Sequence, residues 1–202
     1  DGRRRVRHDA PAGRGCARAV NGARLAMRPV FVAGIATTAF GRHLDRPVHD
    51  LAREAFAEAA RDAGCAIEDI GAAFYSGITQ GHLQGQGAIP GHVVFGRIGV
   101  DSIPIFNVES ACASGSAAFH LAIQSLRAGG ADVALALGAE KMNVIDKAKA
   151  FSMFEGGWDV SRSDENRQAL ERMAEGLEVP NQHQGGPPSS AFMNIAAGLC
   201  RQ

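Results

Sequence analysis

The segment around Cys112 constrains the fold more than any other part of the chain. A β-prone apolar run at residues 103–108 leads into this cysteine, and a helix pattern of apolar and small residues then occupies residues 113–127. A helix that is apolar or small on nearly every side must be covered on more than one face. The segment therefore predicts a buried strand that turns directly into a buried helix, with Cys112 at the turn.

A cysteine at such a turn can be chemically reactive. The first N–H groups of a helix have no intrahelical partner and carry partial positive charge, which stabilises a thiolate over a thiol. A thiolate at this place is an activated nucleophile for acyl chemistry, so Cys112 is the candidate catalytic residue. The alternative role is that of a small buried hydrophobe, which is the usual role of a free cysteine.

The small residues that follow Cys112 favour the catalytic interpretation. Gly115 lies inside the helix pattern, where glycine costs about 1 kcal/mol relative to alanine. We expect another helix, a second subunit or a substrate to approach this helix closely and to require the small side chains.

Strand and helix patterns alternate from residue 30 onward. The helix pattern at residues 48–63 has an apolar face opposite an acidic face, and Gly64 is a good stop signal. The segments with strand character are short and apolar; they are residues 30–35, 72–77, 103–108 and 132–137. Alternation of this kind predicts an α/β fold, with a parallel sheet and crossover helices.

The other segments carry weaker signals. Residues 77–99 are rich in glycine but lack both the dinucleotide fingerprint and the P-loop lysine, so they are interpreted as a flexible loop with a short helix. His82 and His92 have no acidic or cysteine partners at ligand spacing, so structural or solvated roles are favoured over a metal site. Helices are also expected at residues 164–178 and 191–200.

Composition excludes several classes of function. The formal net charge of the 202 residues is zero, so there is no electrostatic footprint for nucleic acid. The sequence has no apolar run long enough to span a bilayer. The cysteines are spaced neither for zinc nor for a disulfide framework, which favours a reducing, cytoplasmic compartment; they are Cys16, Cys65, Cys112 and Cys200.

The first 26 residues differ from the rest. They are rich in Arg, Gly and Ala and have weak apolar periodicity. We interpret residues 1–26 as a disordered or non-native leader, with Met27 as the expected native start.

Residues 107–142 resemble the nucleophile region of thiolases. The similarity lies in the segment Asn-Val-Glu-Ser-Ala-Cys-Ala-Ser-Gly-Ser at residues 107–116 and in Gly-Ala-Glu-Lys-Met at residues 138–142. The second segment resembles the family's Gly-Gly-x-Glu-x-Met signature, with Ala139 in place of the second glycine. The match is closest to sterol-carrier-protein-type thiolases and acetyl-CoA acetyltransferases.

The resemblance implies a fold and a domain organisation. It implies the N-terminal half of a thiolase-like αβαβα body, in which the helix after Cys112 lies between two sheets. Residues 27–142 would form the N-terminal domain, with the order βαβαβαβ. Residues 143–202 would begin the loop domain that covers the coenzyme A site.

The resemblance also implies a reaction. Cys112 would attack an acyl-CoA thioester, and the acyl-cysteine would then condense with a second acyl-CoA, or the reverse in thiolysis. Coenzyme A thioesters are the substrates, and no separate cofactor or metal is expected. A homodimer is expected, with residues 103–108 near its two-fold axis. The resemblance assigns no residue of the chain to contacts with coenzyme A.

Two catalytic groups of thiolases have no counterpart in the chain. The motifs Gly-His-Pro and Cys-x-Gly, which carry the histidine base and the second catalytic cysteine, do not occur in it. The chain by itself is therefore expected to be inactive and to fold poorly.

Three alternative functions remain open at this stage. A β-ketoacyl carrier-protein synthase shares the fold, but its nucleophile segment resembles Thr-Ala-Cys-Ser-Ser, whereas the chain has Ser-Ala-Cys-Ala-Ser at residues 110–114. A non-catalytic thiolase-fold subunit in lipid metabolism is a second alternative, against which the intact Cys112 argues. A cysteine hydrolase is the third, but His120 lies two turns along the same helix pattern, away from its start.

Overall fold

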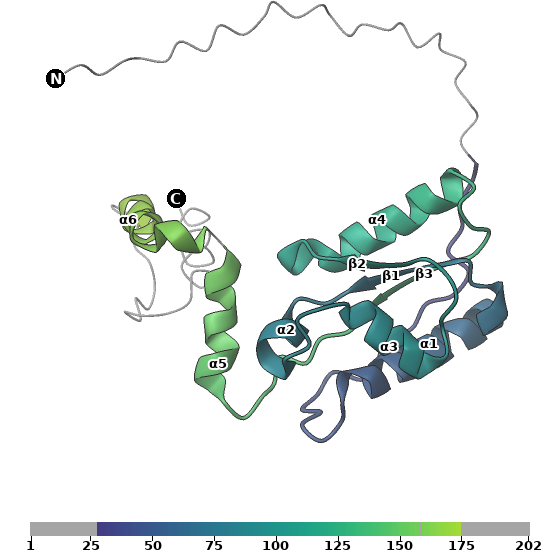
Figure 1. The fold of residues 1–202 in the computed structure, drawn as a ribbon, viewed down its shortest axis with the longest axis horizontal. Coiled ribbons are helices and arrows are strands. Elements are labelled where there is room, and N and C mark those ends of the chain that lie inside the picture. Colours follow the sequence, from purple (N-terminus) through teal and green to yellow (C-terminus); the bar gives the residue numbers. More distant parts are fainter. Residues whose placement is uncertain (1–27, 158, 175–202) are drawn as a thin grey trace, which may run out of the picture.

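A computed structural model describes residues 28–157 and 159–174 of the chain (Figure 1). Its strands are β1 (Ala72–Ser76), β2 (Ile105–Val108) and β3 (Ala134–Gly138). Its α-helices are α1 (Val48–Ala63), α2 (Thr79–Gln84), α3 (Pro90–Ile98), α4 (Ser114–Arg127), α5 (Lys147–Ser152) and α6 (Ser163–Ala174). Short 3-10 turns lie at Ile67–Asp69, Ala111–Ala113, Met153–Gly157 and Val160–Arg162.

The three strands form a parallel sheet in the order β2-β1-β3. In the register, Ala73 of β1 lies opposite Ile105 of β2 and Leu135 of β3. Helix α4 covers one face of this sheet, and α1 and α3 cover the other (Figure 1). The predicted α/β fold with parallel strands and crossover helices is therefore confirmed.

The central strand β1 supplies both cores, because successive side chains of a strand point to opposite faces. Ala73 and Tyr75 face α1 and α3, while Ala72 and Phe74 face α4. All five residues of β1 are buried. Such burial on both faces is typical of a parallel sheet covered by helices, and it explains why the sequence of β1 is apolar rather than alternating.

The predicted helix at residues 48–63 is confirmed as α1, with the same bounds. Its apolar face carries Val48, Leu51 and Phe56 into the core. Gly64 ends the helix in the left-handed conformation, with φ +67°, and its N–H bonds to the carbonyl groups of the last turn. Glycine adopts this conformation without the steric cost that a side chain incurs.

The strand predicted at residues 30–35 is wrong. This segment has no strand ladder, and Phe31 is 82% exposed. It lies against α1 instead: a Cβ on Gly34 would clash with the Ala59 carbonyl oxygen, and the Ile35 N–H bonds to Asp62. A strand requires a neighbour that accepts and donates its backbone hydrogen bonds, and the described residues place none beside this segment.

The glycine-rich segment 77–99 also differs from the prediction, because it contains two helices, α2 and α3, instead of one. Pro90 occupies the first turn of α3, where the absent N–H costs nothing, and Gly99 ends the helix with φ +93°. Because glycine is typical of loops, the glycines of this segment made both helices hard to predict from the sequence pattern. They belong to helix ends and close contacts as well as to loops.

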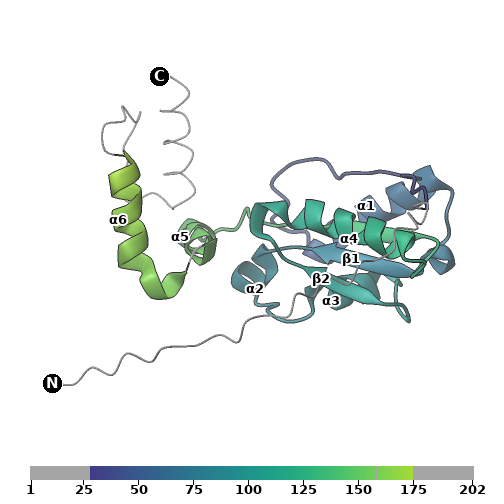
Figure 2. The ribbon, with the colours of Figure 1, turned by 90° about the horizontal axis from the view of Figure 1, so that it is seen from above.

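The C-terminal part of the described chain stands beside the sheet body. Figure 2 shows α5 and α6 next to the α2 end, where they cover neither face of the sheet. The helix predicted at residues 164–178 is found as α6 over the part that is described. The predictions for residues 1–26 and 191–200 lie outside the described residues.

Membrane insertion through a helix finds no support in residues 28–157 and 159–174. None of the helices there combines the length and the apolar character that a bilayer crossing requires.

Two glycines of α3 make a matched test of the packing between α3 and the sheet. A Cβ on Gly91 would lie 2.6 Å from Cβ of Tyr75, whereas a Cβ on Gly96 would meet nothing within 4 Å. Gly91→Ala is expected to lower the free energy of unfolding by about 1–3 kcal/mol through overpacking. Gly96→Ala is expected to raise it by about 0.5–1 kcal/mol, because alanine favours a helix. Urea unfolding of both variants measures this, and a stabilising Gly91→Ala would contradict the packing.

Candidate active site

Cys112 lies where the sequence placed it, between a strand and a helix. Strand β2 ends at Val108, the 3-10 turn at Ala111–Ala113 follows, and α4 begins at Ser114. Ala111 has φ +47°, a left-handed conformation that is strained in a residue with a side chain. Such strain costs about 1–3 kcal/mol and accumulates at functional sites, where the surrounding structure holds it in place.

Side chains on both sides of the turn hold this conformation. The buried Ser114 hydroxyl donates to the Ala111 carbonyl at 2.7 Å and accepts the Ser110 N–H at 2.8 Å. A carboxylate oxygen of Glu109 accepts the Ala111 N–H at 2.5 Å. The backbone adds one bond, from the Ala113 N–H to the Ser110 carbonyl at 2.9 Å.

The Cys112 side chain is exposed, so a reagent in solvent has access to it. The close approach expected at Gly115 is not found in the described part of the chain, where a Cβ at that position would meet only Ser76 Oγ, at 3.9 Å. The cover expected on more than one face of α4 is likewise present on one face only. Ala118 and Ala122 are buried against the sheet, while Phe119 and Leu121 are exposed.

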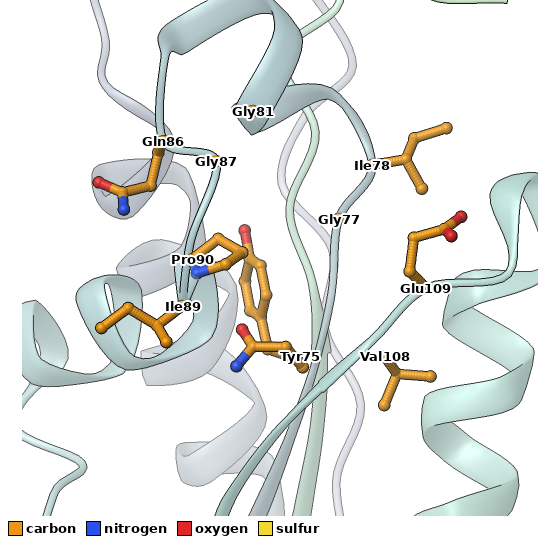
Figure 3. A pocket seen from close by; sticks show the side chains of 11 residues that line it. Tyr75, Gly77, Ile78, Gly81, Gln86, Gly87, Ile89, Pro90, Val108 and Glu109 are labelled. Carbon is orange, nitrogen blue, oxygen red and sulfur yellow. The ribbon is translucent and has the colours of Figure 1, made fainter. Parts of the chain in front are cut away.

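A cavity of about 310 Å³ lies at the carboxyl ends of β1 and β2. Ligands of open parallel sheets bind at this edge. Ile78 and Glu109 line one side of the cavity, opposite Pro90 (Figure 3). Glu109 links the cavity to the Cys112 turn, because it is a lining residue and its carboxylate accepts the Ala111 N–H. The other lining residues are Tyr75, Gly77, Gly81, Gln86, Gly87, Ile89, Asn107 and Val108.

Asn107 of β2 fixes α3 at the cavity. Its side-chain oxygen accepts the Gly91 N–H in the first turn of α3, at 2.6 Å. Its Nδ2 lies 3.3 Å from Nδ1 of His92. Asn107 therefore satisfies an N–H at the helix start that has no partner within the helix.

Glu140 holds the loop on another side of the cavity. Its carboxylate accepts the N–H groups of Ile78 and Thr79 and also the Thr79 hydroxyl. These donors lie at the start of α2, so Glu140 serves as the N-terminal cap that no residue of α2 itself provides. The sequence pointed to Glu140 only through the family signature; its role could not be predicted because its partners lie 61 and 62 residues away.

Tyr75 is a buried residue that lines the cavity. Its hydroxyl donates to Gln80 and to the Ala139 carbonyl, the latter at 3.3 Å, and its ring meets Phe95 edge to face. Burial, reinforced by the negative charge of Glu140, raises the pKa of Tyr75 well above its ordinary value. The side chain is therefore held as a neutral hydrogen-bond donor.

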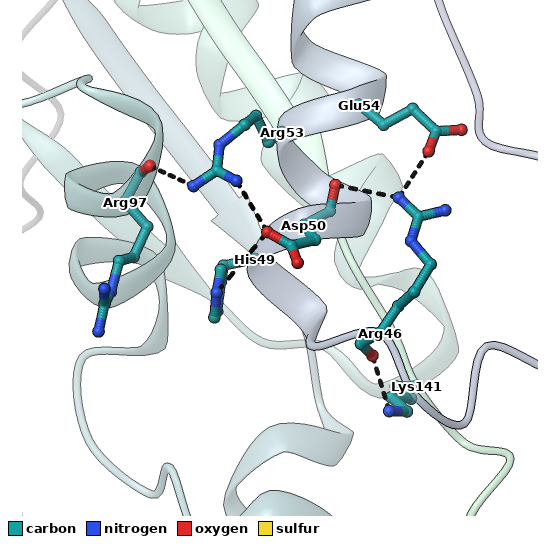
Figure 4. A network of polar contacts seen from close by, with 7 residues as sticks. All are labelled: Arg46, His49, Asp50, Arg53, Glu54, Arg97 and Lys141. Atoms are coloured by element: carbon teal, nitrogen blue, oxygen red, sulfur yellow. Dashed lines mark hydrogen bonds and ion pairs between the residues drawn. The ribbon is translucent and has the colours of Figure 1, made fainter.

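Lys141 anchors the chain that leads into α1. Its Nζ donates to the carbonyl oxygens of Leu44 and Arg46, each at 2.7 Å. Figure 4 shows the contact with Arg46. Arg46 in turn pairs with Glu54 at 2.6 Å. Pairs that are exposed to this degree contribute little stability each. They matter here because they fix the position of the loop beside the carboxyl edge of the sheet.

The same network connects α1 with α3. Arg53 of α1 pairs with Asp50 and also donates to the Arg97 carbonyl near the end of α3, both at 2.8 Å (Figure 4). A cation near the last carbonyl groups of a helix is favourable, because those groups carry partial negative charge.

His82 and His92 have hydrogen-bonding partners. His82 of α2 bonds through Nε2 to the Lys149 carbonyl and to the Ser152 hydroxyl of α5. Within residues 28–157 and 159–174, no three side chains of His, Cys, Asp or Glu gather in a way that could hold a metal ion.

The raised pKa of Tyr75 predicts a loss of stability in base. An unfolded chain releases the tyrosine proton near pH ~10, whereas the folded chain retains it. Unfolding therefore becomes easier as the pH rises above that value. The chain has one tyrosine, so the near-ultraviolet absorbance of tyrosinate reports on Tyr75 alone. We expect tyrosinate to appear only together with unfolding, and Tyr75→Phe to remove this part of the pH dependence; ionisation of the folded chain at the ordinary pH would contradict the burial.

Comparison with known proteins places this site in a family. Residues 30–182 match the family described as thiolase, N-terminal domain. The acetyl-CoA acetyltransferase of Methanocaldococcus jannaschii is 34% identical over 145 residues, which are 71% of this chain and 35% of that protein. Sterol carrier protein 2 of Gallus gallus is 35% identical over 135 residues, which are 64% of this chain and 23% of that protein. The chain thus spans about a third or less of the length of these relatives.

One solved structure aligns with part of the chain. The acetyl-CoA acetyltransferase of Syntrophomonas wolfei aligns with a TM-score of 0.45 and 26% identity, over 52% of this chain and 27% of that one. The family match covers more than half of the chain and includes β1–β3, α4 and the Cys112 turn. The chain belongs to the thiolase family, whose N-terminal domain it contains.

Proposed function

We propose that the protein to which this domain belongs is a thiolase-type acyl-CoA acyltransferase, with Cys112 as the acyl acceptor. The observation that carries the proposal is the exposed Cys112 thiol on a strained strand-to-helix turn of a thiolase N-terminal domain. The name acetyl-CoA acetyltransferase, which two of the similar archaeal proteins carry, supports the same reaction.

The proposed reaction has two steps. In the first, the Cys112 thiolate attacks the thioester carbonyl carbon of an acyl-CoA, the bond to the coenzyme A sulfur breaks, and coenzyme A leaves and takes up a proton. In the second, another acyl-CoA loses a proton from the carbon next to its carbonyl, and that carbon attacks the acyl-cysteine. The products are 3-oxoacyl-CoA and the free Cys112 thiolate, and thiolysis is the reverse.

The reaction requires groups that we assign to a second thiolase half. A histidine would deprotonate Cys112, and a second cysteine would act as acid and base on the other substrate. The coenzyme A thioesters are themselves the reactants, so the proposed chemistry needs no separate cofactor. A cytoplasmic location fits the free thiols of Cys65 and Cys112.

The cavity beside the Cys112 turn is the proposed place of the acyl group. Three of its lining residues, Ile78, Ile89 and Val108, offer apolar side chains to a short acyl chain. Glu109 connects this wall with the turn that carries Cys112. The acyl group would therefore leave the thioester carbon at the turn and extend along the carboxyl edge of the sheet.

A homodimer through β2 is the proposed assembly. Among the described strands, β2 pairs on one side only, so its other edge is open. Phe106 of β2 is 47% exposed and stacks on Phe74 at 4.9 Å between ring centroids. An open strand edge with an exposed aromatic side chain is suited to pairing with a second copy.

The catalytic role predicts the effect of one substitution in the complete protein. Cys112→Ala is expected to lower the rate of acetoacetyl-CoA thiolysis by a factor on the order of 10⁴ or more, because removal of a nucleophile removes the covalent pathway. The thermal midpoint should stay close to that of the wild type, since the substitution removes one exposed sulfur atom. Cys65→Ala is the matched control and should retain the activity. Persistent thiolysis by Cys112→Ala would refute the assignment.

The proposed dimer predicts the effect of a second substitution. Phe106→Lys, measured by light scattering on the complete protein, is expected to raise the dimer dissociation constant by about tenfold or more, because interface charges without partners cost several kcal/mol. Phe40→Lys is the control, because Phe40 is 98% exposed and belongs to the segment before α1 rather than to β2. Circular dichroism checks that both variants fold. A wild-type protein that is monomeric and fully active would contradict the dimer.

A further inference from the structure

The hydroxyl of Ser114 has an unusual position in the Cys112 turn. Ser114 is the first residue of α4 and is only 5% exposed. Its oxygen is bonded on both sides of Ala111: it accepts the N–H of Ser110 and donates to the carbonyl of Ala111. A single side chain thus bonds the Glu109–Ser110 peptide and the Ala111–Cys112 peptide, which lie on either side of the Ser110–Ala111 peptide.

The two hydrogen bonds of the Ser114 hydroxyl restrict the conformation of Ala111. The N–Cα bond of Ala111, about which φ is +47°, lies between the two groups that Ser114 bonds. Rotation of φ by itself would move the Ser110 N–H and the Ala111 carbonyl relative to each other, and at least one of the two bonds would break. A compensating flip of the Ser110–Ala111 peptide would spare these two bonds, but it would break the bonds of that peptide's N–H to Glu109 and of its carbonyl to the Ala113 N–H. Alanine has a Cβ and resists the left-handed region, so the turn needs a bond of this kind where glycine would not.

The conformation of Ala111 in turn sets the place of Cys112. Cys112 is the next residue, and its thiol is exposed at the start of α4. The Glu109 carboxylate holds the Ala111 N–H on the side of the cavity. Relaxation of Ala111 would swing the Cys112 peptide group and thiol away from the direction they have at the helix start.

We propose that Ser114 is a positioning residue, whose hydroxyl holds Ala111 in the left-handed conformation and thereby fixes the Cys112 thiol at the start of α4. Ser114 is buried beneath the turn, and its hydroxyl acts on backbone groups of the turn rather than on a substrate. The catalytic consequence rests on the proposed function of Cys112 as acyl acceptor. The positional consequence concerns the geometry of the turn and is measurable without that reaction.

The test is the rate at which iodoacetamide alkylates Cys112 in the complete protein near neutral pH, resolved by peptide mass spectrometry. Cys65, half-buried beyond the end of α1, is the internal standard for global unfolding. Ser114→Ala is expected to slow alkylation of Cys112 by about fivefold, the population effect of one lost hydrogen bond, with the Cys65 rate unchanged. Ser116→Ala, on the exposed side of the same helix, is the matched control and should match the wild type.

A second pair of variants separates positioning from a general loss of stability. Ala111→Gly lets residue 111 adopt a positive φ without strain, so the double variant Ala111→Gly/Ser114→Ala should recover most of the lost Cys112 rate. Ser114→Thr keeps the hydroxyl and should also stay close to the wild type. Hydrogen exchange at the Ser110 amide should accelerate in Ser114→Ala and stay slow in Ser116→Ala.

The outcomes divide clearly. An unchanged rate of Cys112 alkylation in Ser114→Ala overturns the proposal. The proposal is also overturned if Cys65 is alkylated faster in Ser114→Ala, which indicates unfolding, and the double variant does not recover the Cys112 rate. If Ser114→Ala does not fold, the other variants decide. The proposal is supported if Ser114→Thr keeps the wild-type rates of Ser110 amide exchange and Cys112 alkylation, and Ala111→Gly keeps them as well. Slow alkylation of Cys112 in Ser114→Thr overturns the proposal. A wild-type Cys112 that acyl-CoA does not protect from alkylation would count against the proposed function and leave the positioning result intact.

Discussion

Burial of β1 on both faces is the constraint on which the rest of the structure depends. Its side chains alternate between the α1–α3 layer and the α4 layer, so both cores require this strand. Its backbone pairs with β2 on one side and β3 on the other, which places the carboxyl ends of the strands at a common edge. The Cys112 turn, the Glu140 cap and the cavity all lie at that edge because the strands that carry them are parallel.

The segment that follows β3 organises the loops around the cavity. Glu140 caps α2, Lys141 holds the loop that leads to α1, and the Ala139 carbonyl accepts the Tyr75 hydroxyl. Consecutive residues of one short segment thus reach three different parts of the chain. Caps and hydrogen bonds of this kind give modest stability, but they fix the loops that lead into α1 and α2.

The Cys112 site combines local strain with incomplete cover. Ala111 holds a conformation that costs free energy, and α4 leaves Phe119 and Leu121 exposed in the described part of the chain. A strained, exposed turn destabilises the fold. Under the proposed role of Cys112, this cost would accompany a geometry that is present before any substrate binds. The hydrogen bonds of Ser114 and Glu109 are the compensation that the structure provides.

The sequence by itself determined the elements whose signals are local. The apolar face of α1 with its glycine stop, the short apolar runs of β1, β2 and β3, and the strand–cysteine–helix junction all follow from periodicity within about fifteen residues. The family and the position of Cys112 followed from the same junction. Only the tertiary structure decided whether residues 30–35 form a strand, since a ladder depends on a neighbour that no local pattern reveals. It alone decided the role of Glu140, whose donors lie about sixty residues away, and the left-handed φ of Ala111. Hydrogen bonds between distant segments depend on which strands lie side by side, and that arrangement is set by burial of the whole chain rather than by any segment of it.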